Sequence, residues 1–270
     1  MLGMAVATIV PSMAAMKVAS MIEAMTKGRA AGVTVLTIVA LNRRGPGEGN
    51  APEEGLALYS HGMQSPSDRH YYEPSKGHGL AHDPLNAIIG PRPIGWISTR
   101  GSEGHLNLAP YSFFNAFCYK PPIIGFSSTG SKDTLRNARD TGEFVWNLAT
   151  REIAEHMNAT SATVAYETDE FSLAGLTAAP STLVKPPRVA ESPVNFECKV
   201  TQIVQLQDHR QQPAAAWLVL GEVVAVHILR SLLKDGIFDT FGAGVVLRAG
   251  GPSGYAAITP TSRFDMKRPP

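Results

Sequence analysis

The stretch PPIIGFSSTGSKDTLRNARDTG, Pro121 to Gly142, runs from an apolar strand candidate through small hydroxyl residues into a helix candidate. The helix is predicted to have Ser131 as its N-cap and to end before Gly142. The free N–H groups and the positive dipole end of a helix start attract an anion. Lys132 would add a point charge there, and the neighbouring hydroxyls would add donors. By itself the stretch favours an ordinary capped helix, with a phosphate cradle as the alternative.

The shorter segment GFSSTGSKDT, Gly125 to Thr134, is close to the phosphate loop of nucleotide hydrolases but does not match it. In that loop, Lys directly follows the second glycine and is itself followed by Ser or Thr. Here Ser131 separates Gly130 from Lys132, and Asp133 follows the lysine. We find no strand that ends in a metal-binding Asp. Any bound anion is therefore expected to be a monophosphate rather than ATP.

The composition excludes several classes of protein. With 44% hydrophobic and 17% charged residues in 270, the chain has enough apolar side chains for a sizeable core. A formal charge of +1 gives no electrostatic case for nucleic acid or an anionic membrane as partner. The two cysteines, Cys118 and Cys198, exclude a disulfide scaffold and indicate a reducing, cytoplasmic location. Both are expected to be buried apolar residues. The eight scattered histidines do not predict a metal site.

The first 69 residues differ from the rest of the chain. Ala31–Leu41, AGVTVLTIVAL, is shorter than the roughly 20 residues of a membrane span. Asn42–Gly55 has the Gly, Pro and charge content of a flexible linker. Met63 is a natural internal start, so our hypothesis is that residues 1–62 have no role in the main activity or are not translated. We expect residues 1–69 to be a poorly ordered extension and residues 70–270 to be the functional domain.

The second part of the chain reads as mainly β with a few helices. AIIGPRPIGWISTR, Ala87–Arg100, contains two apolar runs broken by Pro91 and Pro93, which is typical of an edge or bulged strand. VNFECKVTQIVQL, Val194–Leu206, alternates between apolar and polar residues, and WLVLGEVVAVHI, Trp217–Ile228, is apolar on both faces as in a central strand. Further strands are predicted in PPIIGFSS and EFVWNLAT, and helices in SKDTLRNARDTG and REIAEHMNA. This content favours a closed or partly open barrel.

A second segment just upstream strengthens the case for a ligand. WISTRGSEGHLNLAPYSFFNAFCYKPP, Trp96–Pro122, places three polar residues at a strand end, makes a glycine-containing turn and returns through Asn107 to Ser112. The small residues and Pro110 of the returning segment would let a flat ring lie close to the backbone. The backbone N–H groups could then reach ring oxygens and nitrogens. Trp96 and Trp146 could stack on such a ring, but strand tryptophans are more typical of a core.

These two segments, together with LVKPPRVAESPVNFECKVTQIVQL, LRAGGPSGYAAI and FDMKRP, resemble the flavin reductase-like family of FMN-binding split barrels. The family includes flavoredoxins and is related to the reductase components of two-component monooxygenases. The similarity covers roughly residues 70–270, so it implies an FMN-binding split β-barrel for that part. It also implies a homodimer, possible pairing with an oxygenase, and FMN contacts from Arg248 and Tyr255 of either chain.

The resemblance also implies which residues bind FMN. A strand end lines the flavin, a loop runs along its ring and ribityl chain, and a third segment holds its phosphate. In that order the residues are Ser98, Thr99 and Arg100; Asn107, Leu108, Ala109, Pro110, Tyr111, Ser112 and Asn115; and Ser127, Ser128, Lys132, Asp133 and Thr134.

The resemblance implies a function without a catalytic side chain. A flavin accepts hydride from a nicotinamide by its own chemistry, so we nominate no nucleophile or acid–base pair. The leading hypothesis is an NAD(P)H-dependent FMN oxidoreductase that delivers electrons to free flavin or a partner. The alternatives are a non-enzymatic flavoredoxin-type electron carrier and a barrel that binds another phosphorylated ligand.

Overall fold

The computed structural model describes residues 68–269. The chain divides into two units, Met1–Lys76 and Gly77–Pro270. Of the first unit, the described part contains one short 3-10 helix, η2 (Pro74–Lys76). The expected extension at 1–69 lies outside the described residues except for Asp68 and Arg69, as does the proposed start at Met63. The boundary at residue 69 therefore stays a prediction.

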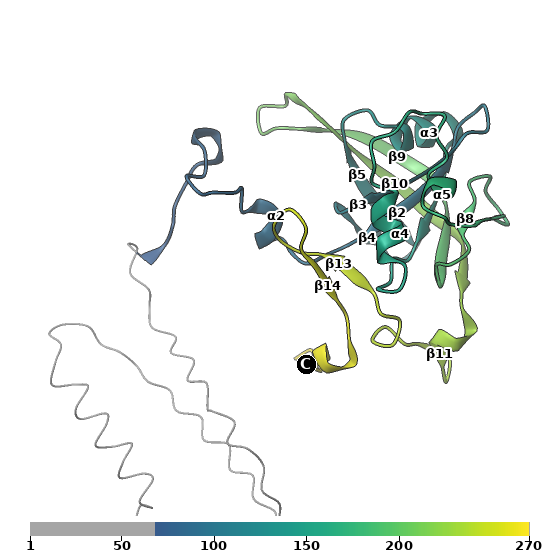
Figure 1. Cartoon of the computed structure of the whole chain (residues 1–270). Coiled ribbons are helices and arrows are strands. Elements are labelled where there is room, and N and C mark those ends of the chain that lie inside the picture. The colour runs from purple at the N-terminus through teal and green to yellow at the C-terminus, as the bar shows by residue number, and fades with distance from the viewer. Residues whose placement is uncertain (1–67, 270) are drawn as a thin grey trace, which may run out of the picture. The chain divides into compact units, whose positions relative to one another are not determined.

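The second unit is built on a seven-stranded antiparallel sheet in the order β3-β2-β6-β9-β10-β5-β4. Figure 1 shows this sheet curling into a half-barrel, with α3 across one end. The prediction of a mainly β protein with few helices is confirmed. The strands are β2 (Gly95–Arg100), β3 (Leu106–Tyr111), β4 (Phe114–Cys118), β5 (Ile123–Thr129), β6 (Glu143–Asn147), β9 (Val194–Gln207) and β10 (Pro213–Ile228).

The long hairpin of β9 and β10 forms the middle of the sheet. β10 pairs with β9 on one side and β5 on the other, which confirms the central position predicted for Trp217–Ile228. A Cβ on Gly221 of β10 would come within 2.3 Å of the Phe144 ring on β6. Glycine is therefore required there, because only a residue without a side chain leaves room for the buried phenylalanine.

The edge strand predicted at Pro91 and Pro93 is confirmed for the short strand that contains Pro93, which lies at the edge of a three-stranded sheet and pairs with Val246–Arg248. The prediction is wrong for the next strand, Gly95–Arg100. β2 lies inside the sheet and pairs with both β3 and β6. Pro91 and Pro93 precede it, and Pro93 belongs to the two-residue strand β1 (Arg92–Pro93). The apolar run before them forms the short helix α2 (Leu85–Ile88) rather than a strand. The missing proline N–H groups thus fall outside the ladder of β2.

Helix α3 (Asp133–Thr141) packs its apolar side onto the inside of the curled sheet. Leu135 and Ala138 are buried there in a cluster with Phe126, Phe144 and other barrel residues. Gly142 ends the helix with a φ of 70°, as predicted. The predicted N-cap is wrong by one residue: Lys132, in an extended conformation, occupies the cap position and makes no side-chain capping bond. The N–H groups of the first turn therefore lack a side-chain cap.

Shorter elements complete the unit. Helices α4 (Ala154–Ala159) and α5 (Glu170–Leu173) pack on a second apolar cluster that contains Trp96, Leu108, Met157 and Phe171. Trp96 is fully buried, as predicted for a core tryptophan. A three-stranded sheet joins β1 to two late strands, and two small ribbons stand apart from it. The remaining elements are β7 (Ala178–Ala179), β8 (Arg188–Val189), η3 (Arg230–Leu232), β11 (Leu233–Lys234), β12 (Ile237–Phe238), β13 (Val246–Arg248), β14 (Tyr255–Ala257) and η4 (Pro260–Ser262).

The two cysteines have different environments. Cys198 on β9 is buried, as predicted, and its burial raises the pKa of its thiol above the ordinary value. Cys118 is exposed, so the prediction that both are buried is wrong. It lies at the end of β4, which is at the edge of the sheet and leaves most of its side chains open to solvent.

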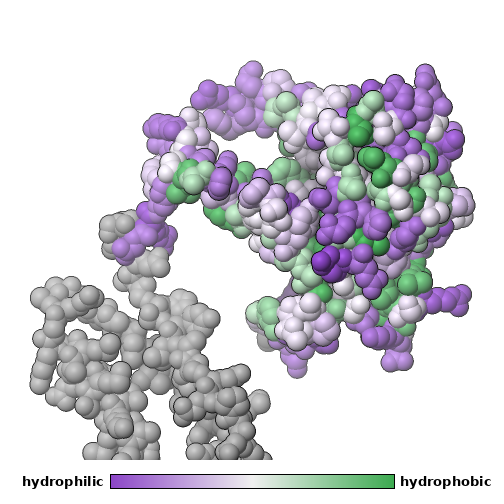
Figure 2. Space-filling model, viewed as in Figure 1, coloured by the Kyte–Doolittle hydropathy of each residue, from purple (hydrophilic) through white to green (hydrophobic). Residues whose placement is uncertain are grey.

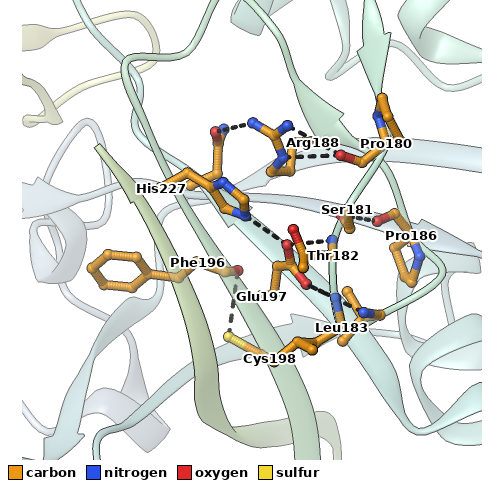
Figure 3. A network of polar contacts seen from close by, with 12 residues as sticks. Pro180, Ser181, Thr182, Leu183, Pro186, Arg188, Phe196, Glu197, Cys198 and His227 are labelled. Carbon is orange, nitrogen blue, oxygen red and sulfur yellow. Dashed lines mark hydrogen bonds and ion pairs between the residues drawn. The ribbon is translucent and has the colours of Figure 1, made fainter. Parts of the chain in front are cut away.

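Glu197 of β9 is a buried carboxylate within the barrel wall (Figure 3). Its oxygens accept hydrogen bonds from the backbone N–H groups of Thr182, Leu183 and Val184, and Oε1 lies 2.6 Å from Nε2 of His227. Burial by itself would raise the pKa of Glu197, but the N–H groups and the His227 ring outweigh burial and lower it. The carboxylate thus holds the loop before β8 against the sheet.

Candidate functional site

A cavity of about 440 Å³, here called the α3 cavity, opens beside the start of α3. Its wall comes from β3, the end of β5, the first turn of α3, Glu170 and the loop 160–164. β3 and β5 are distant in the order of the sheet, so the curl of the barrel is what brings them together. The wall is rich in hydroxyl groups and carries Lys132 as its one cationic side chain.

The turn between β5 and α3 presents these groups to the α3 cavity. Gly130 has a φ of 82°, a conformation that glycine adopts without strain, and it reverses the chain directly after β5. Lys132 then leads into the uncapped first turn of α3. Because free helix N–H groups and a lysine both favour negative charge, this corner of the cavity suits an anion.

Buried side-chain hydrogen bonds fix the start of α3 against the sheet. The Asn107 amide donates to Oγ1 of Thr134 at 2.8 Å and to Oγ1 of Thr99 at 3.1 Å. The Asn137 amide also donates to Thr99, at 3.2 Å. Thr99 therefore lies behind the cavity wall, where it accepts hydrogen bonds from both sides, and Thr134 is held in a fixed position at the wall.

Tyr111 of β3 contributes a buried hydroxyl without a partner. Its side chain lines the α3 cavity and only 8% of the residue is exposed, yet the phenol oxygen makes no hydrogen bond to any described residue. Burial raises the pKa of Tyr111, and the nearby hydroxyls of Thr134 and Ser128 only partly oppose this rise. A buried donor without a partner is costly, so the Tyr111 hydroxyl is a candidate partner for a ligand atom.

The loop 160–164, TSATV, lies along the α3 cavity, and the sequence reasoning did not find it. Thr160 is fixed by an indole N–H bond from Trp96 at 3.0 Å and by its own bond to the Met157 carbonyl at 2.7 Å. Two residues beyond the loop, Tyr166 donates to Asn137 at 3.0 Å, and the Arg136 guanidinium lies 3.7 Å from its ring centre. The sequence signal for this loop is a run of hydroxyl residues directly after a helix. Its position in the sequence does not show that it lies beside α3.

Glu170, at the start of α5, is a further residue that the sequence reasoning did not nominate. It lines the α3 cavity while only 6% exposed, and its Oε2 accepts a hydrogen bond from the Leu108 N–H at 3.1 Å. Burial raises the pKa of Glu170, the N–H groups of Leu108 and of Glu170 itself oppose the rise, and Asp133 and Asp169 add to it. The cavity therefore contains a carboxyl group whose pKa lies above its ordinary value.

Nine of the fifteen residues that the family resemblance implied line the α3 cavity. They come from three separate stretches of chain, and they are Asn107, Ala109, Pro110, Tyr111, Ser112, Ser127, Lys132, Asp133 and Thr134.

The other six lie elsewhere. Leu108 and Ser128 are buried, and the hydroxyl of Ser128 donates to the Gly130 carbonyl. Asn115 is exposed on β4, where its side-chain oxygen accepts the N–H of Ala116 at 2.8 Å. Thr99 supports the wall from behind, Ser98 donates to the Pro187 carbonyl, and Arg100 lines a separate cavity of about 360 Å³.

Arg248 and Tyr255 lie together on β13 and β14, away from the α3 cavity. The Arg248 guanidinium lies 5.0 Å from the Tyr255 ring centre and donates to the carbonyls of Gly251, Gly254 and Pro252. Tyr255 lines a third cavity of about 400 Å³ beside α4. Within a single chain these two residues therefore do not contribute to the α3 cavity.

Residues 68–269 offer neither a cluster of metal ligands nor a membrane-spanning helix. This part of the chain contains no group of three or more His, Cys, Asp or Glu side chains that could hold a metal ion. None of the helices in the same range has the length and apolar character needed to cross a bilayer.

The chain is similar to known flavin proteins. The family model of the flavin reductase like domain matches residues 90–241. Nitrilotriacetate monooxygenase component B from Bacillus cereus is 30% identical with a TM-score of 0.63, over 69% of this chain and 98% of that one. Flavoredoxin of Desulfovibrio vulgaris (Miyazaki F) is 25% identical with a TM-score of 0.57, over 66% and 90%.

A structure described as a putative flavin reductase with a split barrel domain, from Shewanella frigidimarina NCIMB 400, has a TM-score of 0.59. It is 24% identical, over 69% of this chain and 89% of that one, and it confirms the predicted split-barrel fold.

Proposed function

The chain belongs to the flavin reductase-like family, and on that premise we propose that it is an FMN-dependent NAD(P)H oxidoreductase. The α3 cavity is the proposed site of the flavin, with the phosphate at the start of α3. The observation that carries this proposal is the set of donors in one cavity: the uncapped first turn of α3, Lys132 and the unpartnered hydroxyl of Tyr111.

The donor set fits a single phosphate better than a triphosphate. The cavity wall has one cationic side chain, Lys132, and Asp133 stands where a phosphate loop has the Ser or Thr that holds Mg²⁺. Ser127, Thr134 and Thr163 also line this cavity and could add hydroxyl donors. Helix N–H groups, one lysine and several hydroxyls are the usual partners of a phosphate monoester.

The residues of the chain bind and orient, and they perform no covalent step in this proposal. A bound flavin supplies the hydride chemistry itself. Ala109 and Pro110 line the cavity with small side chains, so a flat ring can lie near the β3 backbone. The hydrogen bond between Asn107 and Thr134 fixes the distance between the two sides of the cavity, which would keep the ligand in one orientation.

The visible absorption spectrum of freshly purified protein tests the proposal directly. We expect the absorption bands of a flavin, or their appearance when FMN is added to colourless protein. Protein that is colourless and takes up no FMN in equilibrium dialysis would overturn the proposal.

A second candidate function is an electron carrier that holds FMN without nicotinamide turnover, and the similarity to flavoredoxin favours it. Anaerobic rapid mixing with NADH and with NADPH separates the two functions. We expect rapid bleaching of the flavin with one nicotinamide. If the flavin bleaches too slowly for turnover with NADH and with NADPH, the protein is an electron carrier instead.

We also propose that the protein is a cytoplasmic homodimer. Apolar side chains stand exposed on and around the edge strand β4 and on β10, and Figure 2 shows apolar groups at the surface of the visible face. Phe117 is 53% exposed, Tyr119 86% and Val226 51%. Exposed apolar area of this kind is typical of a protein–protein interface. Light scattering of the purified protein should give twice the monomer mass, and a monomer at micromolar concentration would contradict the proposal.

Similarity to component B of a monooxygenase supports an oxygenase as the electron acceptor. Such a partner would receive reduced flavin by diffusion or by contact. Co-purification with a tagged protein, followed by an oxygen-consumption assay of the complex, would test this part of the proposal.

A further inference from the structure

Glu170 places a carboxyl group in a cavity that otherwise favours an anion. The start of α3, Lys132 and the hydroxyls of the α3 cavity attract negative charge, whereas an ionised carboxylate in the same wall would repel a phosphate. Glu170 is 94% hidden from solvent, so water screens that repulsion poorly. Its position is fixed as well, because Oε2 accepts the Leu108 N–H at 3.1 Å. The side chain cannot simply turn away from a bound anion.

The charges around Glu170 are mostly negative. Asp169 is its neighbour at the cap of α5, and Asp133 acts on it from the first turn of α3, where Asp133 is paired with Arg136 at 2.7 Å. Tyr111 of β3 adds no charge, because a phenol is neutral near pH 7 and burial raises its pKa further. On α4, His156 makes a 2.7 Å contact with the carbonyl of Ala174, at the far end of α5. Lys132 is therefore the cation that lines the cavity, and a phosphate would also draw on its charge.

We propose that Glu170 takes up a proton from solvent when the phosphate of FMN binds, and that its carboxylic acid group then donates a hydrogen bond at the phosphate end of the ligand. This inference rests on the proposed function and deepens it: Glu170 becomes the residue that distinguishes a phosphorylated flavin from riboflavin. Burial, first of all, and the two aspartates already raise the pKa of Glu170, and a dianionic phosphate would raise it further. No oxidant, reductant or other co-reactant is needed, because one proton moves from water to Oε1 or Oε2.

The proposal predicts a linkage between pH and FMN affinity. A group that gains a proton on binding makes affinity fall as pH rises, by up to about tenfold for each pH unit. The second pKa of a phosphate monoester is about 6, so above pH 7 the ligand itself stays a dianion. Riboflavin lacks the phosphate and should bind with nearly constant affinity over the same range. The useful window is thus pH 7 to 9.

Glu170→Gln is the diagnostic variant. Glutamine keeps an oxygen to accept the Leu108 N–H and carries an NH₂ donor in place of the acid proton. A purely structural Glu170 would be replaced by Gln without any change in pH profile. Glu167→Gln is the matched control, since Glu167 is exposed on the same segment and does not line the cavity.

The experiment is a fluorescence titration of wild type and both variants with FMN and riboflavin from pH 7 to 9. Calorimetry at pH 7.5 in two buffers of different ionisation enthalpy would count the protons taken up. We expect the FMN affinity of wild type and Glu167→Gln to fall with rising pH and a net proton to be absorbed. Glu170→Gln should show a flat profile, no proton uptake and tighter FMN binding than wild type at pH 9.

Two results would overturn the inference while leaving the proposed function intact. One is FMN binding by wild type that is independent of pH and absorbs no proton. The other is a Glu170→Gln variant that keeps the wild-type slope, since another group would then be the one that titrates. Absence of FMN binding at every pH, by contrast, would remove the proposed function itself.

Discussion

The side-chain amide of Asn107 on β3 donates a hydrogen bond to Oγ1 of Thr134 on α3, with 2.8 Å between the two atoms. The same amide donates to Thr99 of β2 at 3.1 Å. Both Asn107 and Thr134 are buried and both line the α3 cavity. One side chain therefore sets the distance between the strand and the helix start that form the two sides of the cavity.

Replacing Asn107 with Ala should affect both stability and ligand binding. The variant loses one buried amide that makes two hydrogen bonds, so we expect the free energy of unfolding to fall by about 1–3 kcal/mol. FMN affinity should fall as well, because Thr134 and the first turn of α3 are no longer held in place. Urea unfolding and FMN titration measure the two effects. Asn158→Ala, at an exposed position on α4, is the control, and an equally small change in both variants would contradict the prediction.

Replacing Lys132 with Ala should separate FMN from riboflavin. A hydrogen bond to a charged group contributes about 1.5–3 kcal/mol, so FMN affinity should fall by roughly 10- to 150-fold. Riboflavin has no phosphate and should bind the variant as it binds wild type. Lys199→Ala, an exposed lysine on β9, should bind both as wild type does. If the Lys132→Ala variant lost equal affinity for FMN and for riboflavin, Lys132 would not contact the phosphate.

Replacing Tyr111 with Phe should weaken binding without weakening the fold. The phenol oxygen is buried and has no partner among the described residues, so its removal should leave the free energy of unfolding within about 1 kcal/mol of wild type. FMN affinity should fall by about two- to tenfold, the range of one neutral hydrogen bond. Thermal unfolding and FMN titration test this, with the exposed Tyr119→Phe as control. A strongly destabilised Tyr111→Phe protein would show that the hydroxyl has a structural partner instead.

Replacing Glu197 with Ala should destabilise the barrel in a pH-dependent way. Three backbone N–H groups and His227 lose a buried partner, which typically costs about 3–5 kcal/mol. The pKa of Glu197 is lower in the folded protein, so its contribution is complete above the ordinary carboxyl pKa and is lost as pH falls through the folded value.

The difference in unfolding free energy between wild type and Glu197→Ala should therefore be larger at pH 7 than at pH 4, as measured by urea unfolding. The exposed Glu167→Ala should match wild type at both values. A difference that is the same at pH 7 and pH 4 would mean that the ionised form of Glu197 is not what stabilises the loop.

The features that the sequence determined by itself depend on residues that are neighbours along the chain. Alternation in Val194–Leu206 and the two-sided apolar run Trp217–Ile228 predicted β9 and β10, because both patterns are typical of strands. Burial along β9 does not follow the alternation, since Glu197 is buried and Val204 is exposed. Gly142 predicted the end of α3 for an equally local reason. The motifs around Thr99 and Lys132 identified the family, which the match over residues 90–241 confirms.

Only the tertiary structure decided which polar residues face the ligand cavity. Glu170 and the loop 160–164 reach the start of α3 through the curl of the sheet, although about 30 residues separate them in sequence. Ser98, Thr99 and Ser128 have the right chemistry, but burial uses their hydroxyls in bonds to the protein itself. A sequence shows which groups could bind. Packing decides which of them still have a free donor, because every buried polar group must first find a partner.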